Sequence, residues 1–164
     1  FDLLDPVMPY LANAGRLYAI RAGAWQGLEQ HDRAIRDLLT ARNQGYKDVS
    51  GDLSLAANYE ALEDWPEAER WYKSALEQKG DEEWYAWYEY GGFLLDRSRY
   101  QESRTAYDRS LALKESAETR LMRVYLFDAM GNKDLARKEA ALARKLAQED
   151  DVEWVLEDLK NQGY

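Results

Sequence analysis

The stretch that decides the fold is Ala68-Glu69-Arg70-Trp71-Tyr72-Lys73-Ser74-Ala75, which is preceded by Leu55-Ala56 and Tyr59. Small and large apolar residues follow one another in it at helical spacings. Small residues such as Ala56, Ala68 and Ala75 let two antiparallel helices approach closely, and a large residue such as Tyr72 fills the adjoining hole. One such helix pair cannot bury its apolar face alone, so we expect it to stack on copies of itself.

Copies of this pattern are present on both sides, at spacings of 34, 35 and 33 residues. The residues equivalent to Ala68 are Ala34, Ser103 and Ala136, and those equivalent to Tyr72 are Leu38, Tyr107 and Ala140. Four units in register cover about residues 15–148. A helix–turn–helix unit that repeats in this way predicts an all-α fold.

The spacing resembles the tetratricopeptide repeat (TPR) family, whose unit is a helix–turn–helix of about 34 residues. The resemblance implies an α-solenoid of antiparallel helix pairs, the TPR superhelix. Its expected parts are a lead-in helix or the end of a preceding repeat at 1–14, four repeats at 15–48, 49–82, 83–116 and 117–149, and a capping helix at 150–164. We expect one continuous repeat domain and, because Phe1 replaces an initiator Met, a fragment of a larger protein.

Five residues depart from the family pattern. Arg21 and Arg123 stand where the family usually has Leu, Asp52 and Arg120 where it often has Trp, and Ala140 where it often has Phe. The departures lie mainly in the outer repeats.

Helix boundaries are predicted from capping residues. Asp64, Ser98 and Ser116 are expected to cap the helices that follow them. The sequence Asn43-Gln44-Gly45-Tyr46 is duplicated as Asn161-Gln162-Gly163-Tyr164, which indicates shared helix-stop chemistry. Near the C-terminus, an apolar stripe at i, i+3, i+4 and i+7 predicts a ninth helix; it consists of Val152, Val155, Leu156 and Leu159. This helix is either a capping helix or the first helix of a further repeat.

The composition restricts the classes of function. The chain has a net charge of −9, and residues 47–118 hold 17 acidic and nine basic residues, net −8. This disfavours nucleic acid and anionic membrane, and it favours a partner with a basic patch, or merely solubility. No apolar run is long enough to span a bilayer, so we expect no direct membrane insertion of this segment.

We also expect no enzyme activity, no metal site and no cofactor. Cysteine is absent, and the single histidine, His31, is interpreted as a solvated turn residue. No phosphate loop or nucleotide-binding fingerprint occurs. Adjacent acids such as Glu82 and Glu83 lie near helix starts, where they compensate the helix dipole.

The resemblance implies that the first helix of each repeat lines a concave groove, and this gives a predicted partner-binding surface. Its residues are Leu53, Glu60, Tyr85, Tyr88, Glu89, Asp96, Tyr125 and Asp128. Tyrosines supply contact area with a polar tip, and the acids form the rim. A clamp for a C-terminal carboxylate is not expected, because its cationic positions hold small residues and Tyr125 here. The tyrosines could also simply pack between neighbouring helices.

Three functions remain open. The leading hypothesis is a protein–protein interaction scaffold that binds a partner protein or peptide through the groove. The second is a glycan-binding or partner-recruiting segment of a bacterial exopolysaccharide or cell-envelope export protein, with a cationic polysaccharide as ligand; it places the chain in the periplasm rather than the cytoplasm. The third is a structural spacer.

Overall fold

The computed structural model describes residue 8, residue 11 and residues 13–164, and the predicted lead-in at 1–14 lies almost wholly outside them. The described residues form α-helices and contain no β-strand, which confirms the predicted all-α class. Contacts divide the chain into two compact units, Phe1–Gly80 and Asp81–Tyr164. Each unit is described by itself below, and the expectation of one continuous repeat domain stays a prediction.

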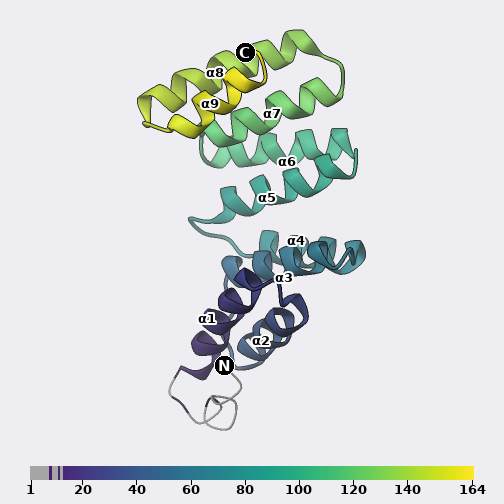
Figure 1. Ribbon diagram of the computed structural model, residues 1–164, viewed down its shortest axis with the longest axis vertical. Coiled ribbons are helices and arrows are strands. Elements are labelled where there is room, and N and C mark those ends of the chain that lie inside the picture. Colours follow the sequence, from purple (N-terminus) through teal and green to yellow (C-terminus); the bar gives the residue numbers. More distant parts are fainter. Residues whose placement is uncertain (1–7, 9–10, 12) are drawn as a thin grey trace. The chain divides into compact units, whose positions relative to one another are not determined.

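All described helices except the last form consecutive pairs. The first unit contains α1 (Ala14–Gly27), α2 (His31–Asn43), α3 (Val49–Ala61) and α4 (Trp65–Glu77). The second contains α5 (Glu83–Asp96), α6 (Tyr100–Leu113), α7 (Ala117–Ala129), α8 (Lys133–Glu149) and α9 (Glu153–Asn161). Within each pair the two helices pack along their length and run antiparallel, as α7 and α8 do in Figure 1. This is the packing of an α-solenoid.

The small residues predicted to sit where two helices touch are completely buried. Ala34, Ala68, Ser103 and Ala136 are each 0% exposed, and they occupy the same position in the four helix pairs. The large residues that follow them, such as Tyr72 and Tyr107, are buried as well. The packing therefore repeats with the spacing that the sequence predicted.

The turn inside each pair also repeats. It contains one residue in the left-handed conformation, with φ of 57° at Glu29, 59° at Glu63, 57° at Ser98 and 72° at Gly131. The N–H of the following residue donates to the carbonyl five residues earlier, as from Asp64 to Tyr59, at 2.9 Å. Ser98 is therefore part of the turn, and the prediction that it caps α6 is wrong, because Arg99 precedes the helix and no side chain caps it.

The other predicted caps are confirmed. Asp64 accepts a hydrogen bond from the backbone N–H of Glu67, and Ser116 accepts one from that of Thr119. The duplicated helix stops also share one geometry. Gly45 and Gly163 have φ of 84° and 82°, and the tyrosine after each donates its N–H to the carbonyl five residues earlier. Gly adopts this left-handed conformation at little cost, so the repeated tetrapeptide ends two helices in the same way.

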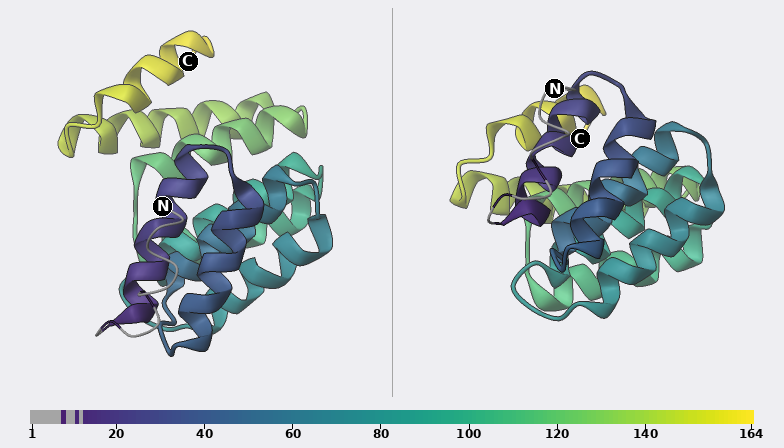
Figure 2. Two further views of the ribbon diagram at one scale, coloured as in Figure 1. Left: turned by 60° about the horizontal axis from the view of Figure 1, so that its bottom comes forward. Right: turned by 90° about the horizontal axis from the view of Figure 1, so that it is seen from below.

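Helix α9 covers the end of the α7/α8 pair. Figure 2 shows it crossing beside α8, and it packs against both α7 and α8. Val155 and Leu159 of the predicted stripe are 0% exposed and belong to one core cluster with Val124 and Phe127. The predicted helix is therefore present, although it begins at Glu153 rather than at residue 150, and its role as a cap stays a prediction.

At four of the five positions that depart from the family pattern, the residue is charged and forms an ion pair. Arg21 binds Asp37 through two hydrogen bonds of 2.6 and 2.8 Å, and both residues are buried. Asp52 pairs with Arg42. Arg120 and Arg123 both bind Glu139, at 2.8 and 3.0 Å. A buried charge is costly unless it is paired, so these contacts explain how charged residues are tolerated there.

Candidate functional site

The predicted groove residues of the first unit have structural roles. Leu53 of α3 is only 8% exposed and belongs to the core. Glu60, at the other end of α3, accepts a hydrogen bond of 2.5 Å from the hydroxyl of Tyr72 on α4. Neither side chain offers a partner the open surface that the groove hypothesis needs, although Glu60 remains partly exposed.

Helix α5 of the second unit presents the predicted tyrosines. Tyr85 is 42% exposed and stacks on Tyr88, with ring centroids 5.8 Å apart. Burial raises the pKa of the Tyr85 hydroxyl, and a hydrogen bond to Glu89 raises it further. Asp96, the last residue of α5, is exposed and lies about two turns beyond Tyr88 and about three turns beyond Tyr85. The structure therefore brings Tyr85, Tyr88 and Glu89 together but leaves Asp96 apart from them.

The predicted residues of α7 are held by the C-terminal segment. Tyr125 donates its hydroxyl hydrogen to Asp158 of α9. Asp128 accepts a hydrogen bond of 2.6 Å from the hydroxyl of Tyr164 and pairs with Lys133 at 3.0 Å. Both side chains help to fix α9 on α7, so their polar atoms are already engaged.

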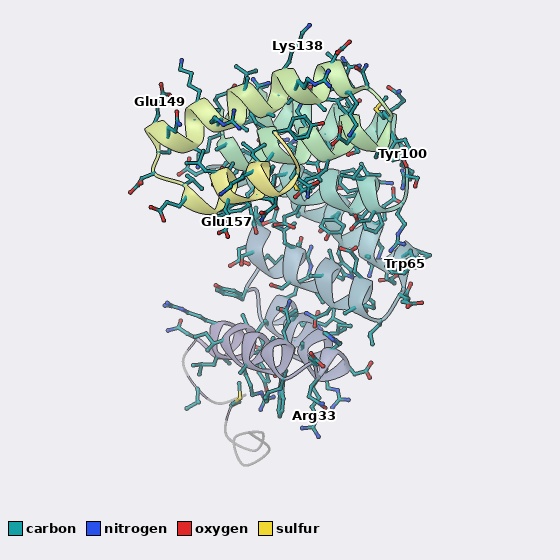
Figure 3. The ribbon with its side chains drawn as sticks, turned by 45° about the horizontal axis from the view of Figure 1, so that its top comes forward. Arg33, Trp65, Tyr100, Lys138, Glu149 and Glu157 are labelled. Carbon is teal, nitrogen blue, oxygen red and sulfur yellow. The ribbon has the colours of Figure 1, made fainter. Side chains whose placement is uncertain are left out.

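A pocket of about 340 Å³ opens between α5, α7 and α9, and we call it the acidic pocket. Its lining residues are Tyr88, Leu121, Met122, Tyr125, Trp154, Glu157, Asp158 and Asn161. Trp154 is 53% exposed, which is unusual for so large an apolar side chain. Glu157, labelled on α9 in Figure 3, is exposed as well.

The pocket combines aromatic walls with negative charge. Burial raises the pKa of Tyr88 to about 12, and the charges of Glu89 and Glu118 contribute to the shift. Tyr125 also has its pKa raised to about 12, by burial and by its hydrogen bond to Asp158. Both tyrosines are thus neutral near pH 7. Neutral aromatic rings beside carboxylates form a surface that attracts a cationic group such as an ammonium or guanidinium.

Sequence reasoning missed the contribution of α9 to this pocket. Trp154, Glu157, Asp158 and Asn161 were not among the predicted site residues. The sequence position of Trp154 did indicate exposure, because Trp154 lies outside the apolar stripe of α9. The packing of that stripe on α7 and α8 therefore does not bury it. The proximity of α9 to Tyr88 could not be read from the sequence, since it depends on how three helices pack.

His31 has a more specific role than the predicted solvated turn residue. It is the first residue of α2, and its Nδ1 lies 3.0 Å from the Oδ1 of Asn58 on α3. Asn58 is 0% exposed and also donates to the carbonyl of Ser54. The interpretation of His31 as a solvated residue is therefore wrong, because its ring hydrogen-bonds a buried amide between two helix pairs.

Within the described part of the chain, no group of three or more His, Cys, Asp or Glu side chains is arranged to hold a metal ion. In the same part, none of the helices has the length and apolar character that crossing a bilayer requires. Comparison of the chain with protein-family models and with curated proteins found no match.

Proposed function

We propose that this chain is a TPR-type interaction module whose second unit binds a basic segment of a partner protein in the acidic pocket. The observation that carries the proposal is the exposure of Trp154 beside Tyr88 and Tyr125, with Glu157 and Asp158 on the same helix. Exposed aromatic residues next to a concave surface are typical of binding hot spots.

The geometry supports a ligand with one cationic side chain and an extended or helical backbone. A lysine or arginine of the partner would place its charge between the aromatic rings and the carboxylates of Glu157 and Asp158. The stacked pair Tyr85 and Tyr88 continues the aromatic surface along α5 and would contact neighbouring residues of the partner. The rim acids would mainly speed association, while the aromatic contacts would slow dissociation.

The test is a titration of labelled peptides that differ only in replacing lysine by norleucine or glutamate. The lysine peptide is expected to bind, and Glu157→Lys should weaken it about tenfold or more. Glu149→Lys is the matched control, because Glu149 is an exposed acid of α8 in the same unit and does not line the pocket. Equal loss in both variants would show that net charge, and not the pocket, controls binding.

A second ligand, an amino-sugar oligomer, is favoured by the same open aromatic surface. Sugar rings stack on exposed Trp and Tyr side chains, and the protonated amines of the oligomer would face the carboxylates. Titration with glucosamine oligomers and with their N-acetylated forms separates this ligand from a peptide. Binding of the cationic oligomers but of none of the peptides would favour the glycan, and failure of both ligands would favour a structural spacer.

A further inference from the structure

The acidic pocket brings aromatic rings together from three helices. Tyr88 comes from α5, Tyr125 from α7 and Trp154 from α9. The ring of Tyr88 is held by two others, since it stacks on Tyr85 with centroids 5.8 Å apart and lies 6.5 Å from the ring of Tyr107. The three aromatic residues of the lining are thus positioned by separate elements around one space of about 340 Å³.

Helix α9 turns one face to the core and another to the pocket. Trp154, Glu157, Asp158 and Asn161 recur at i, i+3, i+4 and i+7, and all four line the pocket. The apolar stripe of the same helix packs on α7 and α8 instead. The packing that holds α9 therefore leaves Trp154 half-exposed at the pocket, with two carboxylates on the next turn.

The α7 side of the pocket offers few free hydrogen-bond acceptors. Tyr125 donates its hydroxyl hydrogen to Asp158, and its oxygen accepts a hydrogen bond of 3.4 Å from the amide of Gln162. The other lining residues of α7, Leu121 and Met122, are apolar. An ammonium group carries three N–H donors, and each needs an acceptor when water is removed. Aromatic and apolar side chains do not supply these acceptors.

A quaternary ammonium group avoids this cost. Methyl groups replace its N–H donors, so it keeps its positive charge and loses no hydrogen bonds when it leaves water. Aromatic faces attract such a cation within about 6 Å of the ring centroid. The carboxylates of Glu157 and Asp158 attract it as well, and this attraction does not require a direct hydrogen bond. Aromatic rings from three helices, with acids on one side, therefore fit a trimethylated nitrogen better than a bare ammonium.

We infer that the acidic pocket selects a quaternary ammonium group, carried either by a trimethyllysine of the partner protein or by a small molecule such as choline. This selectivity rests on the function proposed above, because it specifies the cationic group that the same pocket binds. It assigns the preference among cations to the ring of Trp154, whereas the neighbouring acids attract any cation.

The test extends the titration of the lysine peptide with three further ligands. They are the same peptide with trimethyllysine, the same peptide with an uncharged tert-butyl group in place of the trimethylammonium, and free choline. Chemical shifts of the backbone amides of α9 report binding of every ligand. We expect the trimethyllysine peptide to bind about tenfold more tightly than both the lysine peptide and the uncharged peptide. Binding of choline without binding of the trimethyllysine peptide would assign the group to a small molecule.

Trp154→Leu and Trp154→Phe form a matched pair of variants. Both keep an apolar side chain at the exposed position, but only phenylalanine keeps an aromatic face. Trp154→Leu should abolish the preference for trimethyllysine over lysine, and Trp154→Phe should retain part of it, because tryptophan attracts cations more strongly than phenylalanine. Circular dichroism confirms that both variants remain folded.

Three results would overturn the inference and leave the proposed function standing. They are equal binding of the lysine and trimethyllysine peptides, equal binding of the uncharged and trimethyllysine peptides, and a preference for trimethyllysine that is unchanged in Trp154→Leu. Failure of choline and of all the peptides to bind would contradict both the inference and the proposed function.

Discussion

The ion pair Arg21–Asp37 in the first unit and the pair Arg123–Glu139 in the second occupy the same repeat positions, yet they differ in their surroundings. Glu139 binds Arg120 as well as Arg123, and Arg123 also binds Asp108 of α6. Asp37 binds Arg21 at the wall of a pocket between α1 and α2. The difference teaches that one repeat position can join neighbouring helix pairs in one unit and line a pocket in the other.

The largest effect should come from the buried tyrosines. Tyr107 is 0% exposed and packs so closely on Gly91 that a Cβ atom there would lie 2.5 Å from its ring. Tyr107→Ala should cost about 3–5 kcal/mol through the cavity it leaves, and Tyr72→Ala should do the same in the first unit. Hydrogen exchange measured separately for Phe1–Gly80 and Asp81–Tyr164 reports the loss of stability in each unit for both variants.

We expect each of these variants to loosen mainly its own unit, since each ring packs within that unit. Tyr107→Phe keeps the ring and serves as the control. Equal exchange in both units for Tyr107→Ala would contradict the division into two compact units.

The ion pairs should give the next largest effect. Asp37→Leu leaves Arg21 without the carboxylate that holds it and should cost about 3–5 kcal/mol. Adding Arg21→Leu to Asp37→Leu should recover at least half of the lost free energy of unfolding, because a buried ion pair can often be replaced by apolar residues. Recovery should be smaller for Arg123→Leu added to Glu139→Leu, because Glu139 also holds Arg120. Urea unfolding of the four variants checks this order, and equal recovery in the two units would contradict it.

The left-handed turn residues should give an effect of about 1 kcal/mol. Gly131→Ala puts a Cβ atom on a residue with φ of 72° and should destabilise the second unit by about 1 kcal/mol. Glu63→Gly removes the Cβ atom from a residue in the same left-handed conformation, and it should stabilise the first unit by about 0.5 kcal/mol. Thermal unfolding of both variants measures the changes. A stabilising Gly131→Ala would show that the turn geometry is not as described.

The smallest effect concerns alkaline pH. Burial and the hydrogen bond to Asp158 raise the folded pKa of Tyr125 to about 12, above the ordinary value of 10.0, so the neutral hydroxyl stabilises the fold fully below pH 10. This contribution is lost as pH rises through 12. Tyr125→Phe should cost less than about 1 kcal/mol near pH 8, because the group is partly exposed. The difference from wild type in urea midpoint should shrink as pH rises from 10 to 12; a constant difference would contradict the role of this hydrogen bond.

The repeat register was predictable because it depends on local spacing. Alanine and tyrosine recur with the helical period, so the buried faces, the four helix pairs and the stripe of α9 follow from counting residues. Caps at Asp64 and Ser116 followed for the same reason. The cap predicted at Ser98 was wrong because a serine just before a helix is typical of a cap. In this turn Ser98 instead takes the left-handed conformation, and Arg99 precedes the helix.

The candidate site was only partly predictable. Tyr88 and Tyr125 were identified and do line the acidic pocket, whereas Leu53 lies in the core and Glu60 binds Tyr72. The residues of α9 were missed because their position beside α5 and α7 depends on packing between helices distant in sequence. The pocket between α1 and α2, which Arg21, Arg33 and Arg36 line, was missed because the composition of residues 1–46 is balanced, with five acids and five arginines, and does not show how the charges separate in space.

The claim that the acidic pocket selects a cationic ligand has one direct test, a titration with a matched control variant. The lysine peptide and its norleucine counterpart are each titrated into wild type, Glu157→Lys and Glu149→Lys at low and at physiological salt. We predict that Glu157→Lys loses the lysine peptide, that Glu149→Lys retains it, and that salt weakens the interaction. If both variants weakened binding of the lysine peptide equally, or if neither variant weakened it, the assignment of the acidic pocket would be contradicted.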